Sequence, residues 1–485
     1  MLLFLAGIAV LIAGYFTYGK LVEKILAPDD RQTPAVKNPD GVDFVTLPHW
    51  KNMLIQLLNI AGIGPVIGVI LGIKFGTIVF IILPIGNLIA GATHDMLAGM
   101  MSLRNNGANL TTLVSDNLGK VYSRIFAWFM VILLLLVVAV FVNIPANLIS
   151  GMIPGDWFWY AVVGITVYYV IAALFPVDKI IGAVYPFFGA LLIISTAAIF
   201  AALLYYGFKN PALLQESAEF KKLMFSAEKH QPILPLLFVT IACGIISGFH
   251  ATQSPIVART MKTERQARST FYGMMVAEGI IGMIWAGAGL AIYNLYPQYM
   301  SIGATTVLSN ITNYFLGSVA GKVTVIGVVV LAITSGDTAL RSTRMALGEM
   351  LKIDQKPIFN RLAICLVLLL AVAALLWWSN QSAESFNMLW NYFSWGNQIL
   401  AVTTLLAGAV YLARCGKNRL IALVPGAFML FIVLCYILWI SPAHKGPVGV
   451  GLELKIAYII SAVLVVIITA MVWMYGNKLR NSDKK

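Results

Sequence analysis

Apolar and polar positions alternate along this chain in long blocks, not in the short periods of a soluble helix or strand. Apolar runs of about 18 residues or more recur from one end to the other, and each is long enough to cross a hydrocarbon layer of about 30 Å. The pattern predicts thirteen spans, at about residues 2–18, 53–73, 77–103, 121–148, 157–175, 180–207, 232–258, 270–296, 322–342, 360–378, 386–412, 420–440 and 453–476.

The basic residues between these spans predict which side of the membrane each loop faces. If the N-terminus is outside, the cytoplasmic segments hold 25 of the 33 Lys and Arg residues. Positive residues concentrate in the cytoplasmic loops of multi-pass proteins, so we expect an outside N-terminus and a cytoplasmic C-terminus. The segments counted are 19–52, 104–124, 176–179, 259–269, 341–361, 413–419 and the C-terminal tail.

The composition excludes a soluble protein, because 60% of the residues are hydrophobic and only 11% are charged, against about a quarter charged in soluble domains. The net charge of +13 lies in short loops. We therefore expect a lipid bilayer and no nucleic acid as partner. The cysteines lack CxxC spacing and are expected to be small packing residues: Cys243, Cys365, Cys415 and Cys435.

Three weak internal similarities predict two related halves. They pair LTTLVSDNLGK (110–120) with ATTVLSNITNY (304–314), NIAGIGPVIG (59–68) with IISGFHATQSP (245–255), and VYPFFG (184–189) with NYFSWG (391–396). Two units of five helices have opposite orientations, because five is odd. We expect an all-α integral membrane protein with a five-plus-five inverted repeat, forming one domain over 1–485. Its parts are an extra helix (1–20), the repeats 53–207 and 232–412, and two C-terminal helices (420–476).

The stretch AGIGPVIG (61–68) is predicted to interrupt the second span. Inside a helix Gly costs about 1 kcal/mol and Pro about 3 kcal/mol relative to Ala. An unwound turn exposes amides that suit a carboxylate and carbonyls that suit a cation. The alternative is close helix packing through small residues. The candidate substrate-binding residues here are Gly62, Gly64, Pro65 and Gly68.

A second interruption is predicted at CGIISGFHATQSP (243–255). His250 could bind a substrate carboxylate or relay a proton, or could be a neutral histidine bonded to a neighbouring carbonyl. The hydroxyl groups nearby could bind substrate or bond back to their own helix. The candidate substrate-binding residues are Ser247, Gly248, His250, Thr252 and Gln253.

Three carboxylates lie inside predicted spans, where ionisable groups usually face the bundle interior. Asp95 and Glu278 are candidate coupling carboxylates or buried structural groups, and His94 is expected to point about 100° away from Asp95. Asp337 precedes Arg341 by four residues, so an ion pair on one helix face is possible. The alternative is a proton site, or a Na⁺ site built from Thr334, Ser335, Asp337 and Thr338.

The stretch FNMLWNYFSWGNQILA (386–401) places amides and aromatic rings within about two turns. These side chains could line a substrate path, or form an aromatic belt at the membrane interface. The candidates are Asn391, Trp395, Asn397 and Gln398. HExxH, P-loop, GxSxG and CxxC patterns are absent from the sequence, which disfavours an enzyme.

Several of these stretches resemble the carbon starvation protein A family, from the first helix to about residue 412. They include IAGIGPVIGVILG (60–72), GATHDMLAGMMSLRNNG (91–107), SGFHATQSPIVARTM (247–261), TSGDTALRSTR (334–344) and FSWGNQILA (393–401). The resemblance implies a bacterial inner-membrane transporter made under carbon starvation, with peptides or pyruvate as substrate. It also implies the LeuT/APC-like five-plus-five core. The chain differs from the long members in its compact C-terminal part and in GFHATQSP.

Together these features predict an ion-coupled secondary active transporter for a small carboxylate-bearing nutrient, held between two broken helices. H⁺ or Na⁺ would be the coupling ion, and no other cofactor is expected. The alternatives are a membrane sensor or structural protein that keeps a transporter fold without transport and, less favoured, an intramembrane enzyme. The sequence leaves the substrate, the coupling ion, its stoichiometry and the oligomeric state open.

Overall fold

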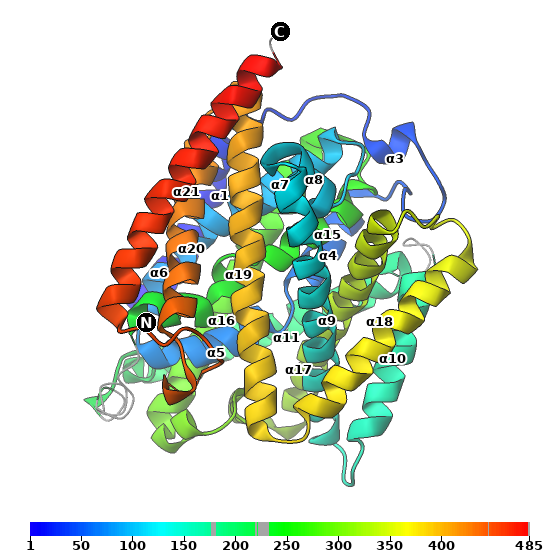
Figure 1. The fold of residues 1–485 in the computed structure, drawn as a ribbon. Coiled ribbons are helices and arrows are strands. Elements are labelled where there is room, and N and C mark those ends of the chain that lie inside the picture. Colours follow the sequence, from blue (N-terminus) through cyan, green and yellow to red (C-terminus); the bar gives the residue numbers. More distant parts are fainter. Residues whose placement is uncertain (176–180, 219–220, 222–231, 445, 484–485) are drawn as a thin grey trace.

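The computed structural model describes residues 1–175, 181–218, 221, 232–444 and 446–483. These residues form a bundle of long helices (Figure 1), in which α19, α20 and α21 run side by side at one edge. The long single helices are α9 (Lys120–Ser150), α11 (Ile181–Lys209), α16 (Gly273–Leu295), α17 (Ala304–Met350), α18 (Ile358–Ser379), α19 (Ala383–Arg414), α20 (Leu420–Trp439) and α21 (Leu454–Ser482).

Ten helices in the described residues are long and apolar enough to cross a membrane, and an eleventh span is formed if one bent pair is counted. Three of the ten are composite. The first joins α1 (Leu2–Phe16) and α2 (Tyr18–Leu26), and the second runs from α6 (Val79–Gly86) through a π-turn, η3 (Asn87–Gly91), into α7 (Ala92–Arg104). The third, Glu264–Leu295, joins the short turns η7 (Glu264–Gln266) and η8 (Arg268–Tyr272) to α16. The predicted span 157–175 is the shorter apolar helix α10 (Phe158–Leu174). The predicted count of thirteen is therefore not confirmed.

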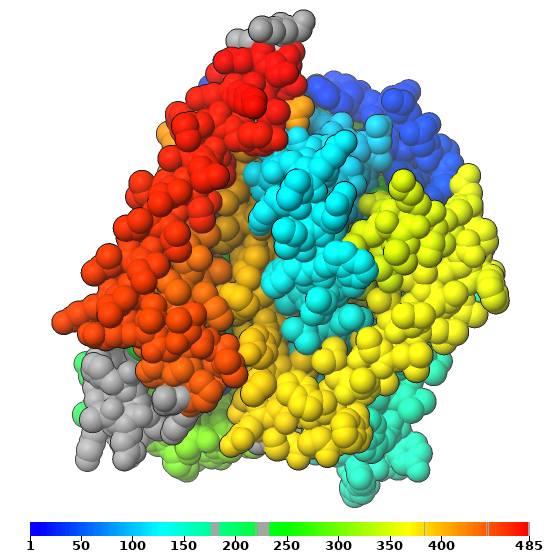
Figure 2. Space-filling view, in the orientation of Figure 1, coloured from blue at the N-terminus to red at the C-terminus, as the bar shows by residue number. Residues whose placement is uncertain are grey.

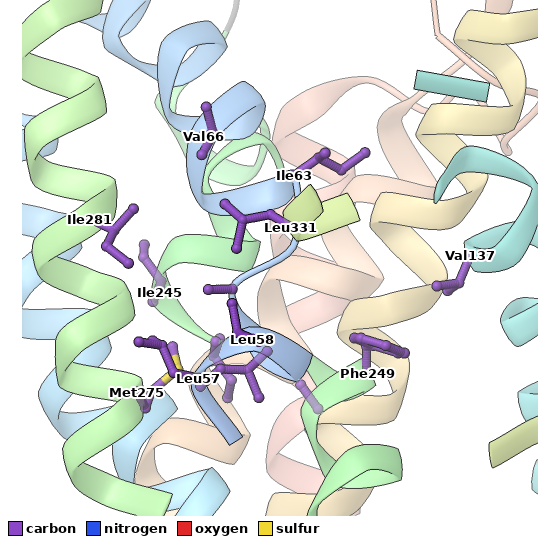
Figure 3. Packing of buried hydrophobic residues seen from close by; sticks show 14 of the residues in the cluster. Leu57, Leu58, Ile63, Val66, Val137, Ile245, Phe249, Met275, Ile281 and Leu331 are labelled. Atoms are coloured by element: carbon purple, nitrogen blue, oxygen red, sulfur yellow. The ribbon is translucent and has the colours of Figure 1, made fainter. Parts of the chain in front are cut away.

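The predicted span 53–73 is bent. It consists of α4 (His49–Ile60) and a second helical part, Gly64–Phe75, which begins with the π-turn η1 (Gly64–Gly68), and the two parts meet at 55°. The apolar side chains of Leu57 and Leu58 lie on one side of the bend, and those of Ile63 and Val66 on the other (Figure 3). All four are buried.

The predicted span 232–258 is broken into short helices. A π-turn, η6 (Ile233–Leu237), is followed by α13 (Phe238–Thr240) and α14 (Ala242–Ile245), and the long remaining piece is α15 (Gly248–Ala258). Ile246 and Ser247 between them have extended backbone. Both predicted interruptions are therefore real breaks of the helix.

The two predicted short segments before long spans differ in how they join those spans. The first is a separate helix, α8 (Leu110–Leu118), whereas residues 304–316 belong to α17. In both places a glycine with positive φ marks the junction, Gly119 at 92° and Gly317 at 77°. Gly317 has non-helical backbone inside α17, so the segment before it bends away from the span that follows.

The outer surface is apolar, as lipid contact requires. Figure 2 shows α21 along one edge of the visible face and α18 along another, with the α8–α9 residues between them. Ile459, Val466 and Met474 of α21 are exposed, and so are Val367 and Leu370 of α18. The polar side chains analysed below face inward, which is the reverse of a soluble bundle.

Gly248 sits where α15 begins against the backbone of α19. A Cβ atom at this position would lie 2.2 Å from the Ala401 nitrogen and 2.3 Å from the Asn397 carbonyl oxygen. Backbone atoms cannot move aside as the end of a side chain can. The break can therefore approach α19 this closely only because residue 248 has no side chain.

We predict that Gly248→Ala lowers the free energy of unfolding by about 1–3 kcal/mol, the usual cost of overpacking. Thermal unfolding of the purified chain in detergent measures this change. The matched control is Gly164→Ala in α10, because a Cβ there would meet nothing within 4 Å. Equal unfolding temperatures for the two variants would contradict the close approach.

Candidate functional site

The first break exposes the carbonyl end of α4, and hydroxyl groups of α17 bind it. The Leu58 carbonyl accepts hydrogen bonds from Thr334 Oγ1 at 3.1 Å and from Ser335 Oγ at 3.2 Å. Thr334 Oγ1 also lies 3.0 Å from the Leu331 carbonyl oxygen. Four oxygen atoms from two helices therefore converge beside the break, a donor set that suits a monovalent cation.

The residues predicted to open this break have different surroundings. Gly62 lies in the break, and its amide donates to the Ile60 carbonyl at 2.7 Å. Gly64, Pro65 and Gly68 begin and end the following turn, η1. A Cβ on Gly64 would lie 2.3 Å from Cys243 Cβ, and one on Gly68 would lie 2.9 Å from the Thr240 carbonyl oxygen. Close packing through small residues is thus present here together with the break, and it brings the two broken spans into contact.

The second break is held by side-chain amides on both sides. Asn397 of α19 accepts a hydrogen bond from the Phe249 amide at 2.6 Å and donates one to Ser247 Oγ at 2.8 Å. Asn87 of η3 donates to the carbonyl of Gly244 at 3.2 Å, and also to that of Met275 in α16 at 3.0 Å. A single asparagine can replace both a missing carbonyl and a missing N–H, so these residues satisfy backbone groups that the break leaves open.

A buried chain of four titratable side chains runs beside the second break. Asp95 Oδ1 lies 2.8 Å from His94 Nδ1, and Asp95 Oδ2 lies 3.1 Å from His250 Nδ1. His250 Nε2 lies 3.7 Å from Glu278 Oε2. Each of these side chains is at most 1% exposed. Three helices, α7, α15 and α16, contribute to the chain.

The structure corrects the expectation for His94. A 100° step around the helix separates the Cα–Cβ directions of His94 and Asp95, but both side chains are long enough to turn and meet. The adjacent pair His-Asp in an apolar stretch was the sequence signal for this contact. His94 Nε2 is buried and has no hydrogen-bond partner within the described part of the chain.

Glu278 differs from Asp95 in its hydrogen bonding. Asp95 accepts from two imidazoles, whereas neither carboxylate oxygen of Glu278 has a hydrogen-bond partner in the described chain. Glu278 interacts electrostatically with Asp95 and with Cys243. Because Cys243 packs against Gly64, the acidic group lies near the place where the two broken spans touch.

Asp337 lies in a separate cluster. Its Oδ2 accepts from the Tyr168 hydroxyl at 2.8 Å and its Oδ1 from the Tyr185 hydroxyl at 3.0 Å. The Tyr185 hydroxyl also lies 3.1 Å from Asn59 Oδ1 of α4. Asp337 thus receives its hydrogen bonds from α10 and α11, while Thr334 and Ser335 bond toward Leu58. Thr338 Oγ1 bonds back to its own helix, 3.1 Å from the carbonyls of both Thr334 and Ser335.

The suggested ion pair between Asp337 and Arg341 is not formed among the residues that the structure describes. Arg341 instead pairs with Asp43 of the 27–48 connector at 2.7 Å. Arg344 lies 3.5 Å from the other oxygen of Asp43. Burial raises the pKa of Asp43, but the two guanidinium groups and that of Arg259 outweigh it and lower this pKa to about 2.

The other predicted residues separate into two groups. Thr252 Oγ1 donates to the Phe249 carbonyl at 2.7 Å, and Gln253 Nε2 donates to Thr252 Oγ1 at 2.8 Å, so both lie within α15 beside His250. Trp395 Nε1 instead donates to the Val433 carbonyl of α20 at 3.1 Å, and Asn391 is half-buried one turn earlier in α19. The indole of Trp395 also packs in a hydrophobic cluster with Val239 of α13, so it contacts the second broken span through apolar atoms while its N–H bonds toward α20.

Several buried polar atoms around the breaks have no hydrogen-bond partner among the residues that the structure describes. Buried polar groups are normally paired, so such atoms indicate a site that a polar ligand or water completes. No group of three or more His, Cys, Asp or Glu side chains in the described ranges is arranged to hold a metal ion. The unpaired atoms belong to Gln56, Asn59, His94, Gln253, Glu278 and Gln398.

Solved structures share the fold of this helical bundle. A manganese transporter of Eremococcus coleocola, in a mutant form, matches with a TM-score of 0.56 at 13% identity, over 92% of this chain and 99% of that chain. MhsT in complex with L-phenylalanine matches with a TM-score of 0.57 at 12% identity, over 89% of this chain and 99% of that chain. At these identities the likeness concerns the fold alone.

The chain belongs to the family described as carbon starvation protein CstA, whose model matches residues 1–163, 156–292 and 294–435. An uncharacterized membrane protein of Haemophilus influenzae is 38% identical over 60% of this chain and 91% of its own length. The peptide transporter CstA of Campylobacter jejuni is 24% identical over 88% and 78%. The pyruvate/proton symporter BtsT of Escherichia coli is 26% identical over 58% and 47%. The protein is thus a multi-pass membrane protein of this family.

We predict that Asn397→Leu destabilises the chain, because the Phe249 amide loses a buried acceptor. Leaving such a group unpaired costs about 1–3 kcal/mol. Thermal unfolding in detergent provides the measurement. Asn391→Leu is the matched control, since Asn391 is one and a half turns away on the same helix and only half-buried. If Asn391→Leu unfolds at the same temperature as Asn397→Leu, the hydrogen bonds of Asn397 do not stabilise the break.

Proposed function

We propose that the protein is an ion-coupled secondary active transporter that takes up a small carboxylate-bearing nutrient, pyruvate or a short peptide or amino acid. The names of its relatives support this substrate class, since they are called peptide transporters and a pyruvate/proton symporter. A transporter fold and transporter family favour a protein that is not an enzyme. They also disfavour a sensor that has lost transport.

The observation that carries the proposal is the contact between two broken spans, each with an unpaired amide. Ile63 in the first break and Ser247 in the second have backbone N–H groups without a partner among the described residues. The second precedes the helical turn of α15, whose amide dipoles favour a negative charge. A substrate carboxylate bound between these two amides would accept a hydrogen bond from each of them. Of the other predicted residues, His250, Thr252 and Gln253 lie on the same helix.

The proposed topology is the five-plus-five inverted repeat, with N-terminus outside and C-terminus cytoplasmic. Three features support it: both broken spans fall at the predicted starts of the repeats, Gly119 and Gly317 mark equivalent bends, and a short amphipathic segment precedes each. One domain, 1–485, would then contain the repeats 53–207 and 232–412. Rocking one helix group against the other would alternate access.

We further propose the proton as coupling ion, held on the chain from Glu278 through His250 to Asp95. An ionised carboxylate buried without hydrogen bonds is expensive, so Glu278 suits the group that carries a proton in this state. His250 lies between two carboxylates and can pass a proton through its two ring nitrogens. Because His250 is on α15, movement of the second break changes the distances along the chain.

Na⁺ is a second candidate, supported by a different observation. The carbonyls of Leu58 and Leu331 and the hydroxyls of Thr334 and Ser335 converge beside the first break. Asp337 and Thr338, which were predicted with them, direct their hydrogen bonds elsewhere. A Na⁺ site would therefore use two of the four predicted residues, with main-chain oxygens replacing the others.

We predict that reconstituted vesicles accumulate labelled pyruvate or a labelled dipeptide when the outside is made acidic, and that an imposed Na⁺ gradient alone has less effect. Measuring the uptake of each substrate under each gradient distinguishes the four combinations of substrate and coupling ion. Thr334→Val with Ser335→Ala removes the hydroxyls, and this double variant should keep proton-driven uptake. No flux of pyruvate, amino acid or peptide under either gradient would favour the sensor alternative.

We predict that Glu278→Gln lowers proton-driven accumulation at least tenfold while counter-exchange of substrate continues. The amide cannot release a proton but retains size and polarity. The comparison variant is Asp337→Asn, which alters the other buried acidic cluster. If Asp337→Asn loses accumulation and Glu278→Gln keeps it, the coupling role belongs to Asp337 instead.

A further inference from the structure

The connector before the first broken span is bonded to the end of the second. This connector, residues 27–48, lies between α2 and α4. The Val45 amide donates to the Arg259 carbonyl at 3.2 Å, and the Leu47 amide donates to the Thr260 carbonyl at 2.9 Å. Figure 1 shows the connector at the end of the bundle where α21 ends. The chain that leaves α15 is therefore held by a segment from the start of the sequence.

Residues 40–44 of the connector form a turn with its own internal hydrogen bonds. Asp40 Oδ1 accepts, at 2.8–2.9 Å, from the amides of Val42, Asp43 and Phe44. The Phe44 carbonyl in return accepts from the Asp40 amide at 3.3 Å. Because these hydrogen bonds lie inside the turn, the turn can move as a unit without losing them.

Two adjacent side chains of this turn join α17 to the end of α15. Asp43 lies between two arginines of α17, with Oδ1 2.7 Å from Arg341 Nη1 and Oδ2 3.5 Å from Arg344 Nη2. The centre of the Phe44 ring lies 4.9 Å from the guanidinium carbon of Arg259, the residue that follows α15. An arginine placed over an aromatic ring is a favourable contact. The turn thus links the second broken span to α17.

Asp43 is the charged group on which this link depends. Arg341 and Arg344 are fully buried, and the carbonyls of Ala172 and Phe175 that also accept from Arg341 carry no charge. An arginine that loses its carboxylate partner becomes a buried unpaired charge, which is costly. Water that entered at this end of the bundle would solvate both arginines. Loss of Asp43 therefore favours an open arrangement over the closed one.

A cavity of about 410 Å³ lies beside the turn and gives it room to move. The cavity is lined by all three contact partners, the turn, α17 and the end of α15: Asp40, Asp43, Phe44, Met345 and Arg259. Asp40 is exposed, whereas Arg259 is buried, so the cavity reaches from the surface toward the end of α15. This helix has 11 residues, or about 16 Å at 1.5 Å per residue. The cavity and the second break thus lie at opposite ends of one short helix.

We propose that the turn of residues 40–44 is a gate that closes one of the two access routes to the substrate site, and that Asp43 holds it closed. The proposal rests on the transport function proposed above. Release of Asp43 from Arg341 and Arg344 would free the end of α15 from α17. Movement of α15 would then connect the cavity with the breaks.

The thiol of Cys243 reports whether the route is open, because it lies where the two broken spans touch. A Cβ on Gly64 would lie 2.3 Å from Cys243 Cβ. The test uses the full chain with Cys243 as its single cysteine, the other three being replaced by serine. Membrane vesicles of both orientations are treated with a small charged thiol reagent that does not cross membranes, and the rate of labelling is measured.

A second single-cysteine chain, which keeps Cys415, identifies the vesicles that present the connector to the reagent. Cys415 is exposed and lines a cavity together with Asn105. The preceding residue, Arg104, donates to the Ala27 carbonyl of the connector at 2.7 Å. Cys415 and the connector therefore lie at the same end of the bundle, whichever side of the membrane that end faces.

Asp43→Asn should raise the rate of Cys243 labelling severalfold from the connector's side and leave the rate from the opposite side unchanged. The matched control is Asp30→Asn, which removes another carboxylate of the connector from an exposed pair with Arg265. This control should label Cys243 as slowly as the chain with neither substitution. Equal rates for the two variants overturn the proposal, and so does an equal increase from both sides of the membrane.

A third single-cysteine chain, which keeps Cys435, separates opening of a gate from general loosening of the bundle. Cys435 is fully buried in α20, so Asp43→Asn should leave its labelling rate unchanged. Equal increases at Cys243 and Cys435 overturn the proposal. If Asp43→Asn fails to fold, Phe44→Ala tests the same turn, because it removes the ring beside Arg259 and keeps every charge. This variant should also raise Cys243 labelling from the connector's side, and an unchanged rate overturns the gate.

Labelling requires no transport, so the gate and the transport function can fail separately. Faster labelling of Cys243 in Asp43→Asn, with no uptake of any substrate by the natural chain, supports the moving turn and contradicts the transporter. Uptake by the natural chain together with an unchanged labelling rate in Asp43→Asn overturns the gate alone.

Discussion

The backbone of a membrane span must satisfy its own hydrogen bonds, because lipid offers none. Two spans of this protein break that rule, and much of the interior is arranged around the consequence. Thr334 and Ser335 bind the carbonyl end of the first break, and Asn397 supplies both an acceptor and a donor at the second. These partners come from α17 and α19, so each break is fixed by helices distant in sequence. Hydrogen bonds from these helices stabilise each break even where other polar atoms beside it remain unpaired.

The buried charges follow from the same constraint. An ionisable group in a membrane interior needs a partner or must become neutral. Asp95 has two imidazole partners, whereas Glu278 has an imidazole nitrogen at 3.7 Å but no hydrogen bond in the described ranges. The two carboxylates therefore differ in hydrogen bonding, although both lie beside His250.

The breaks could be predicted from the sequence because they depend on local residue types. The side chains that bond to the breaks could not be predicted in this way. Gly and Pro in AGIGPVIG and Gly in CGIISGFH disfavour a continuous helix whatever surrounds them. The pairing of Arg341 with Asp43, and not with Asp337, depends on a connector that crosses from about 300 residues earlier in the chain. Helical spacing could not show this long-range pair. It also gave the wrong direction for His94, because spacing fixes the direction of the Cα–Cβ bond and not that of the imidazole ring. The sequence also left the role of Trp395 open, because its hydrogen-bond acceptor lies on another helix, α20.

The two acidic clusters are attached to different broken spans, and this has a consequence for coupling. His250 lies on α15 of the second break, while Asn59, beside Tyr185 and Asp337, lies on α4 of the first. The amides proposed to hold substrate lie in the same two breaks. Occupation of the proposed site would thus bear on both clusters at once. By linkage, if bound substrate changes the proton affinity of a cluster, protonation of that cluster changes the substrate affinity by the same factor. Because the breaks touch at Gly64 and Cys243, a shift of one half-helix requires the other to adjust.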